Sequence, residues 1–259
     1  MSDPLFQALI ESNRRLTDTF ENKANEIDQK VEQTANEIAQ TITSNNVVTY
    51  YVDAENGDDA NTGASSSPFK TVKRAITLCP TGSKAKILLA RGNRYVLDGS
   101  TRSYAAFVEI MPDIYNTDQT KAYHYDETTP VLAIEGSINL YGSICFGGFR
   151  RSMIIETNEN TPSGTVSCWG ASTITIARSR LILNKPADNL PVFGSDYNYL
   201  NPLKVSLRDA DIVKTKGFIA RGGCLFSVDF ATGFQYTDEV ILNATKDNTP
   251  SNVPFTPEG

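Results

Sequence analysis

The chain has 259 residues, 40% of them hydrophobic, so most of it can bury a core. Its formal net charge of −6 argues against nucleic acid and anionic membrane surfaces as partners, because both attract a basic face. No apolar run approaches the roughly 20 residues of a membrane-spanning helix, and the first residues lack the features of a signal peptide, so we expect folding in a cytosol and no membrane insertion.

The first 45 residues carry an uninterrupted heptad pattern. Ser2 and Asp3 supply a helix N-cap and Pro4 a first-turn proline, and no further proline or glycine occurs before Val47. Apolar and small residues recur in steps of four and three, which is the seam of a coiled coil. The seam consists of Phe6, Ile10, Asn13, Thr17, Phe20, Ala24, Ile27, Val31, Thr34, Ile38 and Thr41.

The residue types on this seam favour three parallel chains. Ile10 and Val31 occupy one kind of core position and Ile27 the other, and β-branched residues at both kinds favour trimers. Phe20 needs the room of a wider core, and Asn13 weakens the seam while fixing its register. We therefore predict a trimeric coiled coil over residues 1–45. The alternative, a helix of a globular domain, rarely keeps a strict seven-residue period for so long.

From Val47 onward the chain is rich in β-branched residues and glycine-containing turns. So many short apolar runs without helices between them exclude a doubly wound α/β fold and indicate an all-β domain. The predicted strands are Val47–Asp53, Ala85–Ala90, Tyr95–Leu97, Ala105–Met111, Val131–Glu135, Ser137–Tyr141, Met153–Glu156, Gly164–Trp169, Thr173–Ala177, Leu181–Asn184, Leu203–Leu207, Asp211–Lys214 and Cys224–Phe230.

A weak internal repeat runs through these strands. Residues 138–146 (INLYGSICF), 174–183 (ITIARSRLIL) and 205–213 (VSLRDADIV) each combine an apolar strand, a small or polar corner and a second apolar strand. Cys145 and Cys168 are separated by the length of one coil. Such periods are typical of solenoids, whose coils bury their apolar faces on their neighbours. The pattern favours a β-solenoid, with a β-sandwich as the alternative.

Residues 50–76, YYVDAENGDDANTGASSSPFKTVKRAI, give a more specific signal. The strand, the turn rich in Asp, Asn and Gly, and the PFKT…AI ending resemble the first motif of right-handed parallel β-helix proteins of the pectate-lyase-like superfamily. That motif recurs in tailspikes and fibres of tailed bacteriophages and in secreted bacterial β-helix proteins. The resemblance implies a right-handed parallel β-helix, with its first strand, turn and capping helix in residues 46–76 and its coils in residues 77–242.

Phe69, Val72 and Ile76 fall on one face of a short helix that we expect to begin at Ser67–Pro68. The terminal coil of a solenoid exposes apolar side chains and strand edges, so this face is expected to cover the open end. The preceding turn, Asp53–Asn61, alternates side chains of the kind that hold Ca²⁺ but lacks the spacing of an EF-hand loop. A hydrogen-bonded turn is therefore the favoured interpretation.

A trimeric coiled coil that leads into a capped β-helix without a signal peptide is similar to the layout of phage tail fibres and tailspikes. The resemblance implies a homotrimer in the virion tail, made in the host cytoplasm. Its N-terminus would attach to other tail or baseplate proteins, and the protein would serve host-surface recognition or fibre assembly. Residues 243–259, rich in Pro, Asn and Thr, are expected to form an extended arm toward a neighbouring subunit or a partner protein.

Some tailspikes cleave surface polysaccharides with paired acidic residues, so an enzyme is the alternative function. Glycoside hydrolysis needs two carboxyl groups about 5–10 Å apart. Asp209 and Asp211 are the weak candidates, but in a continuous strand they would share a side with Val205 and Leu207 and point into the core. We therefore expect a corner at Arg208–Asp211 and no enzymatic activity.

Two polar segments carry tyrosines that suit carbohydrate binding. Residues 115–130 contain Tyr115, Tyr123, His124 and Tyr125, and residues 194–202 contain Tyr197 and Tyr199. A tyrosine can stack on a sugar ring while a neighbouring Asp or Asn bonds its hydroxyl groups, and long loops on a rigid scaffold commonly carry function. These side chains are candidate contacts to a host surface glycan. The alternative is that they pack the loops onto the coils or join the subunits.

Metal and nucleophilic chemistry have little material in this sequence. The cysteines show no CxxC spacing, and the chain has a single histidine, so a zinc site or a Ser-His-Asp arrangement is not expected. The residues concerned are Cys79, Cys145, Cys168, Cys224 and His124. We expect reduced, buried cysteines, no metal and no cofactor.

Overall fold

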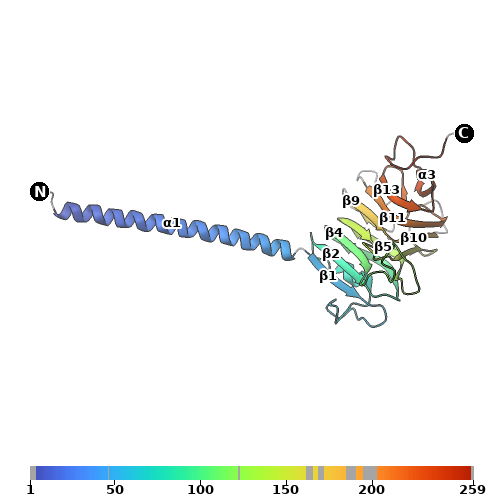
Figure 1. Ribbon diagram of the computed structural model, residues 1–259, viewed down its shortest axis with the longest axis horizontal. Helices are drawn as coiled ribbons and strands as arrows, with labels where there is room; N and C mark the ends of the chain where they lie inside the picture. Colours follow the sequence, from blue (N-terminus) through green and yellow to red (C-terminus); the bar gives the residue numbers. More distant parts are fainter. Residues whose placement is uncertain are drawn as a thin grey trace. The chain divides into compact units, whose positions relative to one another are not determined.

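The computed structural model describes residues 4–45, 47–121, 123–161, 166–168, 172–184, 191–194 and 203–257. The chain divides into two compact units, residues 1–46 and residues 47–259. The first unit is helix α1 (Pro4–Asn45), which runs for 42 residues without a break (Figure 1). This confirms the N-terminal helix that the heptad pattern predicted.

The apolar seam of α1 faces solvent. Phe20 is 68% exposed, Val31 63% and Ile27 59%, although side chains of these types are normally buried. Short ion pairs within the helix lie beside the seam, such as Lys23 Nζ to Glu26 Oε2 at 2.6 Å. No helix in the described part of the chain is long and apolar enough to cross a membrane.

The second unit, which we call the β unit, is built from short strands, and every strand pair in its described residues is parallel. It also contains the short helices α2 (Val72–Thr77) and α3 (Thr237–Val240). The strands are β1 (Val47–Val52), β2 (Lys84–Leu89), β3 (Arg94–Ser103), β4 (Phe107–Pro112), β5 (Val131–Leu140), β6 (Ser143–Phe146), β7 (Ile154–Thr157), β8 (Val166–Cys168), β9 (Ser172–Ala177), β10 (Arg180–Asn184), β11 (Leu203–Lys216), β12 (Ala220–Arg221), β13 (Leu225–Thr232) and β14 (Ile241–Leu242).

The strands wind through successive coils. The first face of the β unit is the series β1-β2-β4-β6-β9-β11-β13, and the second face is β3-β5-β7-β10-β11. Strand β11 belongs to both faces, because residues 203–208 pair with β9 and residues 211–216 pair with β10. Figure 1 shows the strands following one another in chain order along this unit. This curled parallel sheet has the arrangement of a parallel β-helix, whereas β-sandwiches are built from antiparallel strands.

Inward-facing side chains stack in columns at matching positions of successive coils. One column of the first face consists of Val48, Ala85, Val108, Ile144, Ile174, Val205 and Phe226. All members after Val48 are at most 1% exposed. Each fully buried aliphatic side chain contributes about 1.5–3 kcal/mol, so the coils are held together mainly by these columns. The polar residues between them face outward, as alternation along a strand requires.

Strand β5 is continuous, although the sequence predicted separate strands at Val131–Glu135 and Ser137–Tyr141. The glycine between them, Gly136, pairs with Gly99 of β3, which has a φ of 61°. A Cβ atom on Gly136 would lie 2.1 Å from the Gly99 carbonyl oxygen. Two stacked glycines therefore let the chain bend closely from coil to coil without breaking the hydrogen-bonded ladder.

The three residues predicted to face the core, Phe69, Val72 and Ile76, are at most 1% exposed, but only Val72 and Ile76 belong to helix α2. It packs mainly against β3. The helix begins at Val72 rather than at Ser67–Pro68, because Thr71 is its N-cap and accepts a hydrogen bond from the Arg74 backbone N–H. Before the cap, Phe69 forms a parallel bridge with Val52 and is therefore extended.

Residues 243–257, expected to be an extended arm, lie against the last coil of their own chain. Ser251 forms a parallel bridge with Phe226. The Asn252 side chain accepts from the Val228 N–H at 2.8 Å and donates to the Val228 carbonyl at 2.7 Å. It thereby occupies both backbone groups that a further strand would use, and part of the β13 edge is protected.

Cys145 and Cys168 do not occupy matching positions of successive coils, although their spacing predicted this. Cys145 of β6 pairs with Glu109 and Thr175 on the first face, whereas Cys168 of β8 pairs with Leu140 of β5. The two cysteines therefore lie on different sides of one coil, because loops of unequal length separate the strands. Cys145 is buried, and burial raises the pKa of its thiol to about 12.

Candidate functional site

Turns and loops that connect the first face to the second lie along one corner of the β unit. We call it the arginine corner; it comprises residues 90–93, 113–130, 147–153, 178–179, 209–210 and 230. The long 113–130 loop is bonded to the next coil, since the Asn116 N–H donates to the Arg150 carbonyl at 2.7 Å and the His124 N–H donates to Ser152 Oγ at 3.2 Å. Side chains distant in the sequence are thus brought together.

A ladder of left-handed residues turns the chain at this corner. At each of these positions a single residue with a left-handed backbone changes the direction of the strand. Residues other than glycine rarely adopt this backbone conformation. The Arg178 N–H donates to the Arg208 carbonyl of the next coil. Arg208 in turn pairs with Asp229 of β13. The ladder consists of Arg150 (φ 53°), Arg178 (φ 50°), Asp209 (φ 47°) and Phe230 (φ 61°).

Two phenylalanines project from the ladder. Phe149 is 61% exposed and lies between two guanidinium groups, with Arg150 Cζ 5.0 Å and Arg178 Cζ 5.1 Å from its ring centroid. Arg178 Nε also lies 3.2 Å from Asp209 Oδ2. Phe230, opposite Asp209 on the next coil, is 83% exposed. Alternating aromatic, cationic and anionic groups therefore form one outward-facing row, which we call the ridge: Phe149, Arg150, Arg178, Asp209 and Phe230.

Asp126 fixes the 113–130 loop. Its carboxylate accepts hydrogen bonds from Thr117 Oγ1 at 2.6 Å and from the Thr128 N–H at 2.9 Å, and Arg91 Nη2 lies 2.9 Å away. Burial acts to raise its pKa, but these bonds and the Arg91 charge outweigh burial and hold the pKa of Asp126 well below its ordinary value. His124 Nε2 lies 3.6 Å from the same carboxylate. The loop is therefore held in a defined conformation by hydrogen bonds and an ion pair.

Tyr125 packs this loop onto the coils. Arg180 Cζ lies 4.5 Å from its ring centroid, and Tyr123 stacks on it at 5.6 Å. Arg180 Nε is 2.7 Å from Asp211 Oδ2, and Thr232 donates to the other Asp211 oxygen at 3.0 Å. Burial raises the pKa of the Tyr125 hydroxyl. Tyr125 therefore fits the interpretation in which the tyrosine packs the loop onto the coils. Its ring is not open for stacking on a sugar.

Tyr115 is the most open tyrosine of the predicted set in the described residues, at 48% exposed. Arg151 Cζ lies 4.6 Å from its ring centroid, and Arg151 Nη1 donates to the carbonyls of Pro112 and Asp113 at 2.9 Å and 2.8 Å. The structure thus places four predicted contact residues, Tyr115, Tyr123, His124 and Tyr125, on one corner. Tyr197 and Tyr199 lie outside the described residues.

The two weak catalytic candidates also lie at this corner. Asp209 has a left-handed backbone, which places the turn where the sequence predicted a corner. Each carboxylate contacts its own arginine: Asp209 contacts Arg178, and Asp211 contacts Arg180. Glycoside hydrolysis requires two carboxyl groups that face each other across the scissile bond. Carboxylates that are each occupied by a guanidinium do not provide that arrangement.

The sequence did not identify the ridge. Phe149 and Phe230 are exposed and Arg150 and Arg178 half-buried at this corner, which successive coils bring together from distant parts of the sequence. One local signal was available in residues 147–151, GGFRR, which follow the β6 strand directly. Glycines beside an aromatic residue and two cations indicate a turn whose side chains cannot all be buried.

The acidic Asp53–Asn61 turn uses its carboxylates internally. Asp53 Oδ1 accepts from the Glu55 and Asn56 N–H groups, both at 3.0 Å. Asp59 accepts from the Thr71 N–H at 2.9 Å and from Thr71 Oγ1 at 2.8 Å. Among the described residues, no group of three or more His, Cys, Asp or Glu side chains is placed to hold a metal ion.

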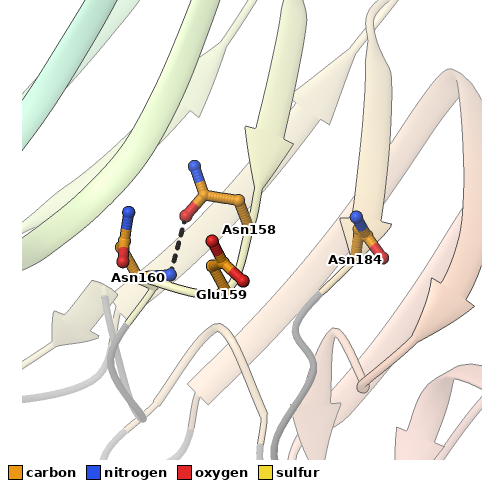
Figure 2. Close-up of a pocket in the computed structure, with 4 residues that line it drawn as sticks. All are labelled: Asn158, Glu159, Asn160 and Asn184. Atoms are coloured by element: carbon orange, nitrogen blue, oxygen red, sulfur yellow. Dashed lines mark hydrogen bonds between the residues drawn. The ribbon is translucent and has the colours of Figure 1, made fainter.

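A polar hollow of about 410 Å³ lies away from the ridge, where β7 and β10 end. Figure 2 shows Asn158, Glu159 and Asn160 on one turn and Asn184 across from them. The Asn160 N–H donates to Asn158 Oδ1 at 2.9 Å, and Asn158 Nδ2 donates to Glu135 Oε1 at 2.8 Å. Amide and carboxylate groups of this kind suit a neutral hydroxylated ligand.

Comparison with known proteins gives one match. The family described as "Protein of unknown function (DUF1565)", which is associated with parallel β-helix proteins, matches residues 55–101. This segment includes α2, β2 and most of β3. Searches of curated proteins and of solved structures found no match to the chain. The family match and the curled parallel sheet together support a parallel β-helix.

Proposed function

We propose that the protein is a homotrimeric component of a phage tail, a fibre or tailspike-like protein that is attached to the virion by its N-terminus. In this proposal the β unit is a right-handed β-helix, and α1 forms a parallel coiled coil with two further copies. The protein recognises the host surface without cleaving it. Support comes from the order of parts along the chain, a long heptad helix followed by a capped parallel β unit.

The observation that carries the trimer is the exposed seam of α1. Isolated helices in water are marginal, and most helical stability in proteins comes from packing of an apolar face. Ile27 and Val31 are more than half exposed in a single chain. Two further copies of the same helix would bury the seam along its length in a register set by Asn13.

The arginine corner supports a recognition role. Its exposed phenylalanines offer apolar ring faces, and its arginines and Asp209 offer hydrogen-bond donors and acceptors beside them. Phe230, which is 83% exposed, and Phe149, which is 61% exposed although two guanidinium groups lie against its ring, place aromatic surface on one corner of a rigid scaffold. A glycan is the ligand class that such a mixed apolar and polar surface suits best.

Binding to host cells tests this function. We expect the fluorescently labelled full-length protein to bind intact cells of a susceptible strain and to release no oligosaccharide from their capsule or lipopolysaccharide. Released oligosaccharide would favour the enzymatic alternative. Binding to purified tail proteins without binding to cells would instead indicate a connector inside the fibre.

A further inference from the structure

Two tyrosines are stacked where the chain returns from the second face to the first. Tyr104 directly follows β3 and Tyr141 directly follows β5. Their ring centroids lie 4.5 Å apart, with an angle of 21° between the ring planes. At that separation the facing carbon atoms are in van der Waals contact, at about 3.5–4.0 Å. Each residue is 45% exposed, so the pair is accessible from solvent.

The backbone holds the two tyrosines in register. The Tyr141 N–H donates to the carbonyl of Ser103, the residue before Tyr104, at 3.0 Å. In the turn after Tyr141, a Cβ atom on Gly142 would lie 2.3 Å from the Ala105 carbonyl oxygen, so the two turns are in direct backbone contact. Successive coils therefore fix the stacking of the two rings.

Arg102 lies near the hydroxyl groups of both rings. A hydrogen bond with the Tyr104 side chain raises the pKa of Arg102, and the electrostatic effect of Tyr104 and Tyr141 adds to it. A single guanidinium close to both phenol groups places their hydroxyl groups on the same side of the stack. The ortho carbon of one ring, which is next to the carbon that bears the hydroxyl, then lies beside the ortho carbon of the other ring.

We propose that Tyr104 and Tyr141 form a site of oxidative cross-linking, at which a one-electron oxidant joins the two rings as dityrosine. The oxidant is of the class that a haem peroxidase generates from hydrogen peroxide. This inference is independent of the proposed recognition function, because both rings belong to one chain. The link closes a loop of the chain covalently, which restricts the unfolded state as a disulfide does.

The cross-link forms by coupling of two radicals. Each phenol gives its hydroxyl hydrogen atom to the oxidant and becomes a phenoxyl radical, whose unpaired electron is shared by the oxygen and the ortho carbons. A carbon–carbon bond forms between the two ortho carbons. Each of these carbons then releases its hydrogen as a proton, and each oxygen takes up a proton, which restores two phenols. Overall the pair loses two hydrogen atoms, and one hydrogen peroxide is reduced to two water molecules.

The other tyrosines at the surface lack one of the two requirements. Tyr123 and Tyr125 are also stacked, at 5.6 Å, but the hydroxyl oxygen of Tyr125 is buried. Tyr115 is 48% exposed, but the group over its ring is the Arg151 guanidinium. Among the residues that the structure describes, only Tyr104 and Tyr141 combine contact between two tyrosine rings with exposure of both.

The experiment treats the full-length protein with a haem peroxidase and hydrogen peroxide and records dityrosine fluorescence, the intact mass and the cross-linked peptides. We expect a chain mass lower by two hydrogen atoms and a peptide link between Tyr104 and Tyr141 of the same chain. Tyr104→Phe should abolish this link, because phenylalanine keeps the ring but has no hydroxyl hydrogen to lose.

Tyr123→Phe is the matched control, because it removes one hydroxyl group from the stacked pair whose partner hydroxyl is buried. It should leave the dityrosine yield unchanged, and circular dichroism checks that both variants keep the fold. An unchanged yield in Tyr104→Phe, or an equal loss in Tyr123→Phe, would overturn the inference. Links that join two chains instead of one would also overturn it, and these appear as a doubled mass on a denaturing gel.

Discussion

At the scale of single residues, this fold depends on how each coil turns its corners. At the arginine corner, non-glycine residues with positive φ turn the chain, and their side chains are half-buried or, at Phe230, exposed. At the opposite end of the second face, Gly99 and Gly136 stack so closely that no side chain fits between them. One corner therefore has room for side chains, and the other is fixed by backbone packing.

Gly136→Ala tests this packing. The added Cβ would lie 2.1 Å from the Gly99 carbonyl oxygen, so β3 and β5 must separate locally, and we expect a loss of about 3 kcal/mol in the free energy of unfolding. Urea denaturation followed by circular dichroism measures it. Gly148→Ala is the control, because its Cβ would meet only the flexible end of the Met111 side chain, Sδ at 3.4 Å and Cε at 3.6 Å. Equal stability of the two variants would show that the bend tolerates a side chain.

At the scale of elements, the 113–130 loop depends on one carboxylate. Asp126 is bonded by Arg91, Thr117 and Thr128, and its side chain is 22% exposed. Because the folded state lowers the pKa of Asp126, its contribution to stability is complete above the unfolded pKa of about 4 and is lost as pH falls through the lower folded value.

Asp126→Asn should therefore lower stability by about 2 kcal/mol at pH 7. The difference from the natural chain should shrink steadily as pH falls below about 4. Unfolding curves between neutral and acidic pH measure this, and hydrogen exchange of the loop amides locates it. Glu127→Gln removes the same charge one residue away and should leave the pH profile unchanged. If the loss of stability in Asp126→Asn did not vary with pH, the loop would depend on the shape of the Asp126 side chain and not on its charge.

At the scale of the whole molecule, local patterns predicted more than long-range ones. The α1 helix and the burial of Val72 and Ile76 follow from spacings within a few turns, so the sequence was sufficient for them. Phe69 is buried as predicted, but from an extended segment rather than from the helix. Most strand positions also followed, because alternation is local, but the separately predicted strands Leu203–Leu207 and Asp211–Lys214 are one continuous strand, β11. The ridge and the position of Cys168 depend on which coils stack, and loops of unequal length hide that register. The sequence identified Asp209 and the tyrosines of residues 115–125 as separate candidates. It could not show that they lie at the same corner of the β unit.

The last prediction concerns assembly through α1. Ile27 is a predicted core position of the seam and is 59% exposed in the single chain. Ile27→Asp would place three carboxylates in a trimeric core. Their mutual repulsion and loss of hydration would separate the helices, because the seam is already weakened by its polar residues. Light scattering of the natural protein should give three times the chain mass of 28.4 kDa, and the variant should give a single chain mass.

The control is Gln29→Asp, two residues away and off the seam, which adds the same charge and should keep the trimer. The circular dichroism of the β unit should persist in the Ile27→Asp monomer, since the columns of Ile144, Ile174 and Val205 are buried within one chain. A natural protein with the mass of one chain would remove the coiled coil from the proposal.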